Sequence, residues 1–130
     1  MELEFFLPPV PEVVGVARAA LAQLMRDHSD DVTDTMCLLV TELITNSLRH
    51  SNVTGGDRIL LKASLGRERV RIQVCDPGST SVPTLQPVSL SATWGRGLVL
   101  VDTLARDWGV RSNGRTCVWF ELDTTASSVH

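Results

Sequence analysis

Three polar side chains that could do chemistry recur at intervals of four residues in the stretch 42–50: Glu42, Asn46 and His50. In a helix, a step of four residues advances only about 40° around the axis, so the three side chains would lie on one face. An amide oxygen is a hard ligand suited to Mg²⁺. A carboxylate one turn away could accept a proton from an attacking hydroxyl or water.

That polar face borders an apolar stripe, which should be the buried side of the helix. The stripe consists of Val32, Met36, Leu39, Val40, Leu43 and Ser47. Burying a carboxylate or an amide without a partner costs about 1–3 kcal/mol. We therefore expect Glu42 and Asn46 either to be satisfied within the chain or to face a pocket whose occupant satisfies them.

Two further segments have the composition of a nucleotide site: Asp76-Pro77-Gly78 and Gly95-Arg96-Gly97-Leu98. A carboxylate at the end of a strand could accept a hydrogen bond from the exocyclic amine of adenine, and Gly78 would let the backbone approach a flat ring. Two glycines and an arginine that open a helix offer N–H groups, a positive dipole end and a guanidinium to phosphate. Alone, each segment is more often a turn or helix punctuation. Together with Glu42 and Asn46 they predict phosphoryl transfer from a nucleotide.

The elements that must position these groups follow from hydrophobic periodicity and breakers. Strands are predicted at 2–7, 58–65, 69–75, 108–111 and 116–122. Helices are predicted from about 11 to 27, from 30 to about 50, and at 98–105. The strand at 69–75 alternates apolar and polar residues, which is typical of a sheet with one face in the core and one in water. The sum predicts an α+β, two-layer sandwich with helices on one face of a mixed, mostly antiparallel sheet.

Length and composition indicate one globular domain at 1–123 with a flexible C-terminal tail at 124–130. The chain has 130 residues, 43% of them hydrophobic and 21% charged, with a net charge of −3. That charge argues against a broad nucleic-acid surface. No apolar run approaches the roughly 20 residues of a membrane span, and the acidic N-terminus reaches proline by residue 8, unlike a signal peptide. We expect a cytoplasmic protein.

The three cysteines, Cys37, Cys75 and Cys117, are scattered and form no C-x-x-C pair. We interpret them as reduced core residues, in keeping with a cytoplasmic location. A redox function is poorly supported by this spacing.

Five segments in this order carry a family resemblance that covers nearly the whole chain. They are 42–50 (ELITNSLRH), 74–78 (VCDPG), 95–105 (GRGLVLVDTLA), 108–110 (WGV) and 114–122 (GRTCVWFEL). The chain resembles GHKL-type ATPase domains, the group that includes gyrase and histidine-kinase catalytic domains. More closely, it resembles the small single-domain anti-sigma-factor serine/threonine kinases in the form abundant in actinobacteria. The resemblance implies the Bergerat-type ATP-binding fold.

The resemblance also implies roles for the residues of the central helix. Glu42 would be the general base and Asn46 the ligand of Mg²⁺. His50 would be a helix-end residue near the pocket, because no separate phosphoacceptor helix pair precedes the domain, so a complete histidine kinase is not expected.

The positions implied to bind ATP are Asn46, Asp76, Gly78, Gly95, Arg96, Gly97, Leu98 and Thr116. Asp76 would bind the adenine amino group, with Gly78 beside the ring. Arg96 and Gly97 would lie against the phosphates, and Thr116 would support the adenine end.

The implied activity is an ATP- and Mg²⁺-dependent serine/threonine kinase that phosphorylates a small antagonist (anti-anti-sigma) protein and sequesters a sigma factor. A homodimer is possible, without direct contact to nucleic acid or membrane. The alternative is a non-catalytic ATP-binding module that regulates by protein contact. It stays open because the 76–80 loop lacks the second glycine of larger GHKL members and the lid lacks lysine. An ATPase that drives conformational change is less favoured, since no transducer domain is visible.

Overall fold

The computed structural model describes residues 1–50, 58–76, 95–112 and 115–124. Its strands are β1 (Glu2–Leu7), β2 (Ile59–Leu65), β3 (Arg69–Asp76), β4 (Asp107–Ser112) and β5 (Thr116–Asp123). Its helices are α1 (Val13–Leu24), α2 (Asp30–His50) and α4 (Gly95–Leu104). The strands form one sheet in the order β1-β2-β3-β5-β4, and each of these neighbouring pairs is antiparallel.

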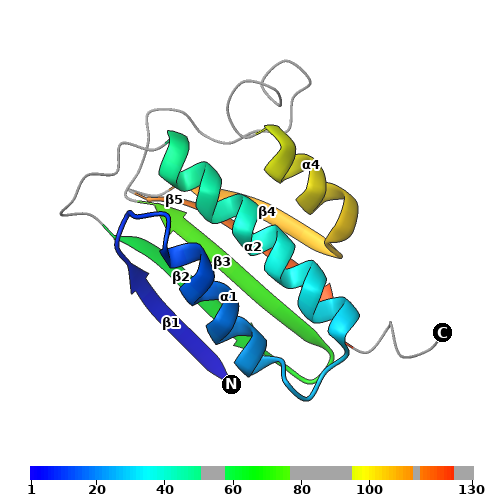
Figure 1. Ribbon diagram of the computed structural model, residues 1–130. Helices are drawn as coiled ribbons and strands as arrows, with labels where there is room; N and C mark the ends of the chain where they lie inside the picture. Colours follow the sequence, from blue (N-terminus) through cyan, green and yellow to red (C-terminus); the bar gives the residue numbers. More distant parts are fainter. Residues whose placement is uncertain (51–57, 77–94, 113–114, 125–130) are drawn as a thin grey trace.

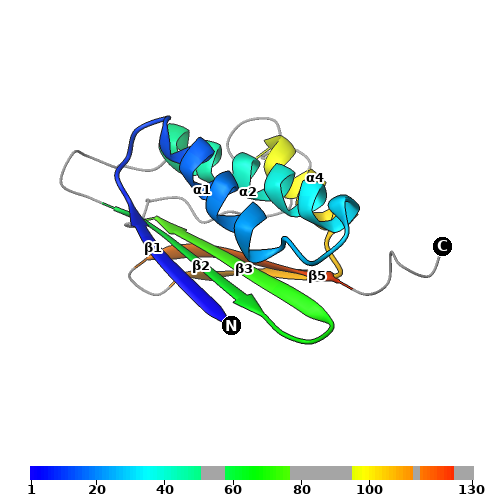
Figure 2. The same cartoon turned by 60° about the horizontal axis from the view of Figure 1, so that its bottom comes forward.

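The predicted two-layer α+β sandwich is confirmed. Helices α1, α2 and α4 all lie on the same side of the sheet (Figure 2), with α2 running across its middle (Figure 1). The core fills the space between the layers, and its largest fully buried side chains include Phe120, Leu21, Met36, Leu43 and Ile72. None of the helices among the described residues combines the length and apolarity that a membrane span needs.

Helix α2 starts and packs as its sequence predicts. The Ser29 hydroxyl accepts a hydrogen bond from the Val32 amide at 3.5 Å, and Asp30 and Asp31 occupy the first turn, where a carboxylate favours the positive helix end. Every member of the predicted apolar stripe is at most 6% exposed. Helix α1 ends earlier than predicted, at Leu24 rather than about residue 27, because Met25 leaves helical geometry to form its C-cap.

The β2–β3 hairpin closes at the predicted turn, where the Gly66 amide donates to the Arg69 carbonyl at 2.9 Å. The alternation in β3 is confirmed, with Val70, Ile72 and Val74 buried against the helices. Thr124, assigned from sequence to the tail, is 6% exposed and its amide donates to Glu68 at 2.8 Å. The rest of the predicted tail and the Asn113-Gly114 turn lie outside the described residues.

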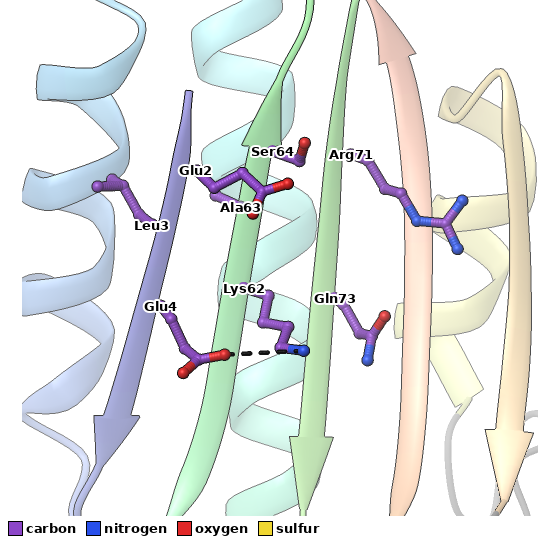
Figure 3. A pocket seen from close by; sticks show the side chains of 8 residues that line it. All are labelled: Glu2, Leu3, Glu4, Lys62, Ala63, Ser64, Arg71 and Gln73. Atoms are coloured by element: carbon purple, nitrogen blue, oxygen red, sulfur yellow. Dashed lines mark ion pairs between the residues drawn. The ribbon is translucent and has the colours of Figure 1, made fainter.

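The sheet face opposite the helices is polar, as the strand alternation predicts. Figure 3 shows the ion pair across β1 and β2 between Glu4 and Lys62, at 3.7 Å. Further along the face, the Arg71 guanidinium lies 4.0 Å from the centre of the Trp119 ring and donates to Glu121 at 3.0 Å. The Glu4–Lys62 pair is half exposed, and surface pairs of this kind contribute little to stability.

Candidate nucleotide site

The chain segments that carry the predicted site are directed to one end of the fold. The C-terminal end of α2, the end of β3 and the start of β5 lie at that end, and α4 begins toward it on the helix side of the sheet (Figure 1). The antiparallel pairing of β3 with β5 causes part of this arrangement, since it brings the last residue of one strand beside the first residue of the other.

Asp76 and Thr116 form the final pair of the β3–β5 ladder. Both residues are buried, at 0% and 2% exposed respectively. Residues two apart in a strand share a face, and Val74 and Val118 belong to the core. Asp76 and Thr116 therefore lie on the side of the sheet that faces the helices. Asp76 has interactions within the molecule, while its Oδ2 accepts no hydrogen bond from the described residues. A buried carboxylate and a buried hydroxyl thus lie side by side beneath the helix layer.

The polar face of α2 lies at the margin of the core, as predicted. Asn46 is 7% exposed and Ser47 is 2% exposed, while Glu42 is half-buried one turn earlier. Asn46 and Ser47 each have interactions within the molecule, so the helix tolerates their burial. Glu42 is therefore the more accessible of the two groups to which we assigned chemistry.

Helix α4 begins at Gly95, earlier than the predicted helix at 98–105, and the segment 95–97, predicted to open the helix, forms its first turn. Leu98 is fully buried and anchors this turn to the core. The first backbone N–H groups of a helix have no partner within it and can bind an anion. Gly78 and the side chains of Arg96 and His50 lie outside the described residues.

A comparison with family models matches residues 7–122 to the histidine kinase-like ATPase domain. The chain belongs to this family. In the solved structures, the domain is similar to the catalytic domain of the histidine kinase ThkA in a nucleotide-free form. The two share 13% identity over 95% of this chain and 97% of that one, with a TM-score of 0.55, which shows a common fold. A search of curated proteins found no match.

Membership makes this a GHKL-type, ATP-binding domain, and the polar side chains at this end of the fold fit that ligand. The buried Asp76 carboxylate offers acceptor oxygens for an amine, and Thr116 adds a hydroxyl beside it. Asn46 offers one amide oxygen. No group of three or more His, Cys, Asp or Glu able to hold a metal exists among the described residues. One protein oxygen is compatible with Mg²⁺, which commonly keeps water and phosphate oxygens as its other ligands.

The interpretation of all three cysteines as reduced core residues is wrong for two of them. Cys75 and Cys117 form a disulfide between β3 and β5, whereas Cys37 is a free, buried thiol as predicted. The two cysteines are 42 residues apart in the sequence, so local pattern does not indicate that they pair. Their positions beside the two site residues could have indicated the disulfide, because Cys75 immediately precedes Asp76 and Cys117 immediately follows Thr116. Any antiparallel ladder that pairs the two polar residues therefore also pairs the two cysteines.

Proposed function

We propose that the domain is an ATP- and Mg²⁺-dependent serine/threonine protein kinase of the anti-sigma-factor type, which phosphorylates a small antagonist protein and sequesters a sigma factor. One observation carries the proposal. The buried Asp76–Thr116 pair closes the β3–β5 ladder, and Glu42 and Asn46 belong to the C-terminal half of α2, whose end lies at the same end of the sandwich as the end of β3 and the start of β5 (Figure 1). Purine recognition and phosphoryl chemistry require these two sets of groups at opposite ends of one bound nucleotide.

The buried pair would hold the base. Asp76 would accept a hydrogen bond from the adenine amino group, and its complete burial keeps water from competing for that bond. Thr116 would support the same end of the ring from the neighbouring strand. The start of α4 would bind the phosphates through its backbone N–H groups, with Gly95, Arg96 and Gly97 in the first turn.

Helix α2 would supply the groups for transfer. Asn46 would bind Mg²⁺ through its amide oxygen, and Glu42 would accept the proton of the attacking serine or threonine hydroxyl. ATP and the metal supply the transferable phosphoryl group and the neutralisation of its charge. Because Glu42 is half-buried, it is accessible to a partner's hydroxyl while remaining shielded from bulk water.

The anti-sigma assignment is supported by the ordered set of sequence motifs from 42–50 to 114–122. The family model spans 7–122, so these motifs lie within or at the border of one ATP-binding domain. The partner proteins, a sigma factor and its antagonist, follow from this resemblance and form part of the proposal.

The test is transfer of the γ-phosphoryl group from labelled ATP, with Mg²⁺, to purified candidate antagonist proteins. We expect label on a serine or threonine of the antagonist, loss of transfer in Glu42→Ala, and nucleotide binding retained in that variant. Asp34→Ala, an exposed carboxylate on the same helix, is the matched control and should transfer at the unmodified rate. ATP binding without transfer to any antagonist would contradict the kinase and favour the non-catalytic regulatory module.

A further inference from the structure

The disulfide lies on the polar side of the sheet, opposite the helices. Val74 comes just before Cys75, and Val118 comes just after Cys117. Both valines are in the core. Side chains alternate along a strand, so the two cysteines point to the other face. They are direct partners in the β3–β5 ladder, with 4.0 Å between their Cα atoms.

The two cysteines differ in their exposure to solvent. Cys75 is 1% exposed, whereas Cys117 is partly exposed. The side-chain amide of Gln73 donates a hydrogen bond to the Cys75 sulfur at 3.2 Å. Cys117 is therefore the cysteine more open to attack by a soluble thiol, while the Cys75 sulfur has a donor that stabilises negative charge on it.

The disulfide is also adjacent to the candidate nucleotide site. Cys75–Cys117 is the penultimate pair of the ladder, and Asp76–Thr116 is the last pair before both strands end. The ends of a sheet ladder open more readily than its middle. A covalent bond one step inside the end restrains the separation of the two strands at the pair that would bind adenine.

We propose that Cys75 and Cys117 are a reversible dithiol–disulfide site that controls nucleotide affinity through the Asp76–Thr116 pair. The inference rests on the proposed nucleotide binding at that pair. In the disulfide form the strand ends are held together and the base site is preorganised. In the dithiol form the last pair opens part of the time, and only the closed fraction binds nucleotide with full affinity.

The redox step balances as ordinary thiol–disulfide exchange with a low-molecular-weight thiol. A thiolate attacks the Cys117 sulfur, a mixed disulfide forms there, and the bond to Cys75 breaks with its electron pair remaining on Cys75. The Gln73 amide stabilises this leaving thiolate, which then takes a proton. A second small-molecule thiolate then attacks the small-molecule sulfur of the mixed disulfide. The bond to Cys117 breaks, Cys117 leaves as a thiolate, and the two small molecules are joined in a disulfide. Re-oxidation by a small-molecule disulfide is the reverse.

The experiment compares MgATP affinity in the two redox forms of the full chain by isothermal titration calorimetry. One sample is equilibrated with oxidised glutathione and the other with dithiothreitol. Alkylation under denaturing conditions, read by mass spectrometry, identifies the forms: of the three cysteines, one should be alkylated after oxidation and all three after reduction. If the Asp76–Thr116 pair is closed about a third of the time in the dithiol form, the Kd of that form for MgATP is about threefold higher than that of the disulfide form.

Variants separate this control from other effects of oxidation. The double variant Cys75→Ser/Cys117→Ser should bind MgATP as the reduced chain does, in either buffer. Cys37→Ser, which removes the buried thiol outside the pair, should keep the full redox response. Gln73→Leu should slow the release of Cys75 during reduction. If the double variant does not fold, the two forms of the unmodified chain still decide.

Equal or tighter MgATP binding in the reduced form would overturn the inference, and so would alkylation of all three cysteines after oxidation. A lack of MgATP binding in both forms, with the expected alkylation pattern, would instead contradict the proposed function. The two failures are therefore distinguishable in one set of samples.

Discussion

Replacing Asp76 with asparagine tests the recognition of adenine. The two side chains have nearly the same shape, so Asp76→Asn keeps the volume of a position that is 0% exposed. The change removes the charge and converts one acceptor oxygen into a donor. The adenine amino group would then lie next to either the NH₂ donor of the asparagine or its neutral carbonyl oxygen, which is the weaker acceptor.

The burial of Asp76 sets the expected size of the effect. A hydrogen bond to a charged group contributes about 1.5–3 kcal/mol, and complete burial removes the solvent screening that would reduce this value. Since about 1.4 kcal/mol corresponds to a factor of ten, the Kd for MgATP should rise roughly 10- to 150-fold. GTP carries a carbonyl where ATP carries the amine, so the preference for ATP over GTP should also shrink or reverse.

Isothermal titration calorimetry with MgATP and MgGTP measures both quantities in the same preparations. Asp34→Asn, an exposed carboxylate on α2, is the control and should leave both Kd values unchanged. Thermal melting of each variant checks that the domain is folded. A Kd for MgATP within threefold of the unmodified chain, or an unchanged ATP-to-GTP ratio in Asp76→Asn, would refute the assignment of Asp76 to the base.

Three further predictions concern the scaffold. Phe120→Ala empties a fully buried position and should lower the free energy of unfolding, measured by urea titration, by about 3–5 kcal/mol. Phe6 is 59% exposed, so Phe6→Ala should lower it by less than about 1 kcal/mol. Equal effects of the two changes would contradict the core assignment. In Gly109→Ala the new Cβ would lie 2.6 Å from the Trp119 Nε1, so we expect a loss of about 1–3 kcal/mol that Trp119→Leu largely removes in a double-mutant cycle. An additive cycle would contradict that close contact. Burial raises the pKa of the Cys37 thiol, so its alkylation at pH 8 should be much slower in the folded chain than in urea; equal rates would exclude this burial.

The sequence was most informative where a period of 3.6 or 2 coincided with clear breakers. The stripe on α2 and the alternation in β3 each require a single buried face, so the layer architecture and the placement of Asn46 follow from local pattern. The end of α1 was misplaced by about three residues because apolar periodicity persists beyond Leu24, while the chain already turns at Met25.

The pairing of β3 with β5 could not be predicted from local pattern. It joins segments about 40 residues apart, and hairpin signals indicate only the pairs β2–β3 and β4–β5. Both the Asp76–Thr116 pair and the Cys75–Cys117 disulfide depend on that non-local pairing. The resemblance to ATP-binding domains placed Asp76 and Thr116 in one site, but it carried no information about the cysteines beside them.

The most direct test of a nucleotide site at this end of the sandwich is a crystal structure of the chain grown with a non-hydrolysable ATP analogue and Mg²⁺. We predict the adenine amino group within hydrogen-bonding distance of the Asp76 carboxylate and the metal bound to the Asn46 amide oxygen. A nucleotide bound elsewhere, or an adenine that does not contact the Asp76–Thr116 pair, would contradict the proposed site.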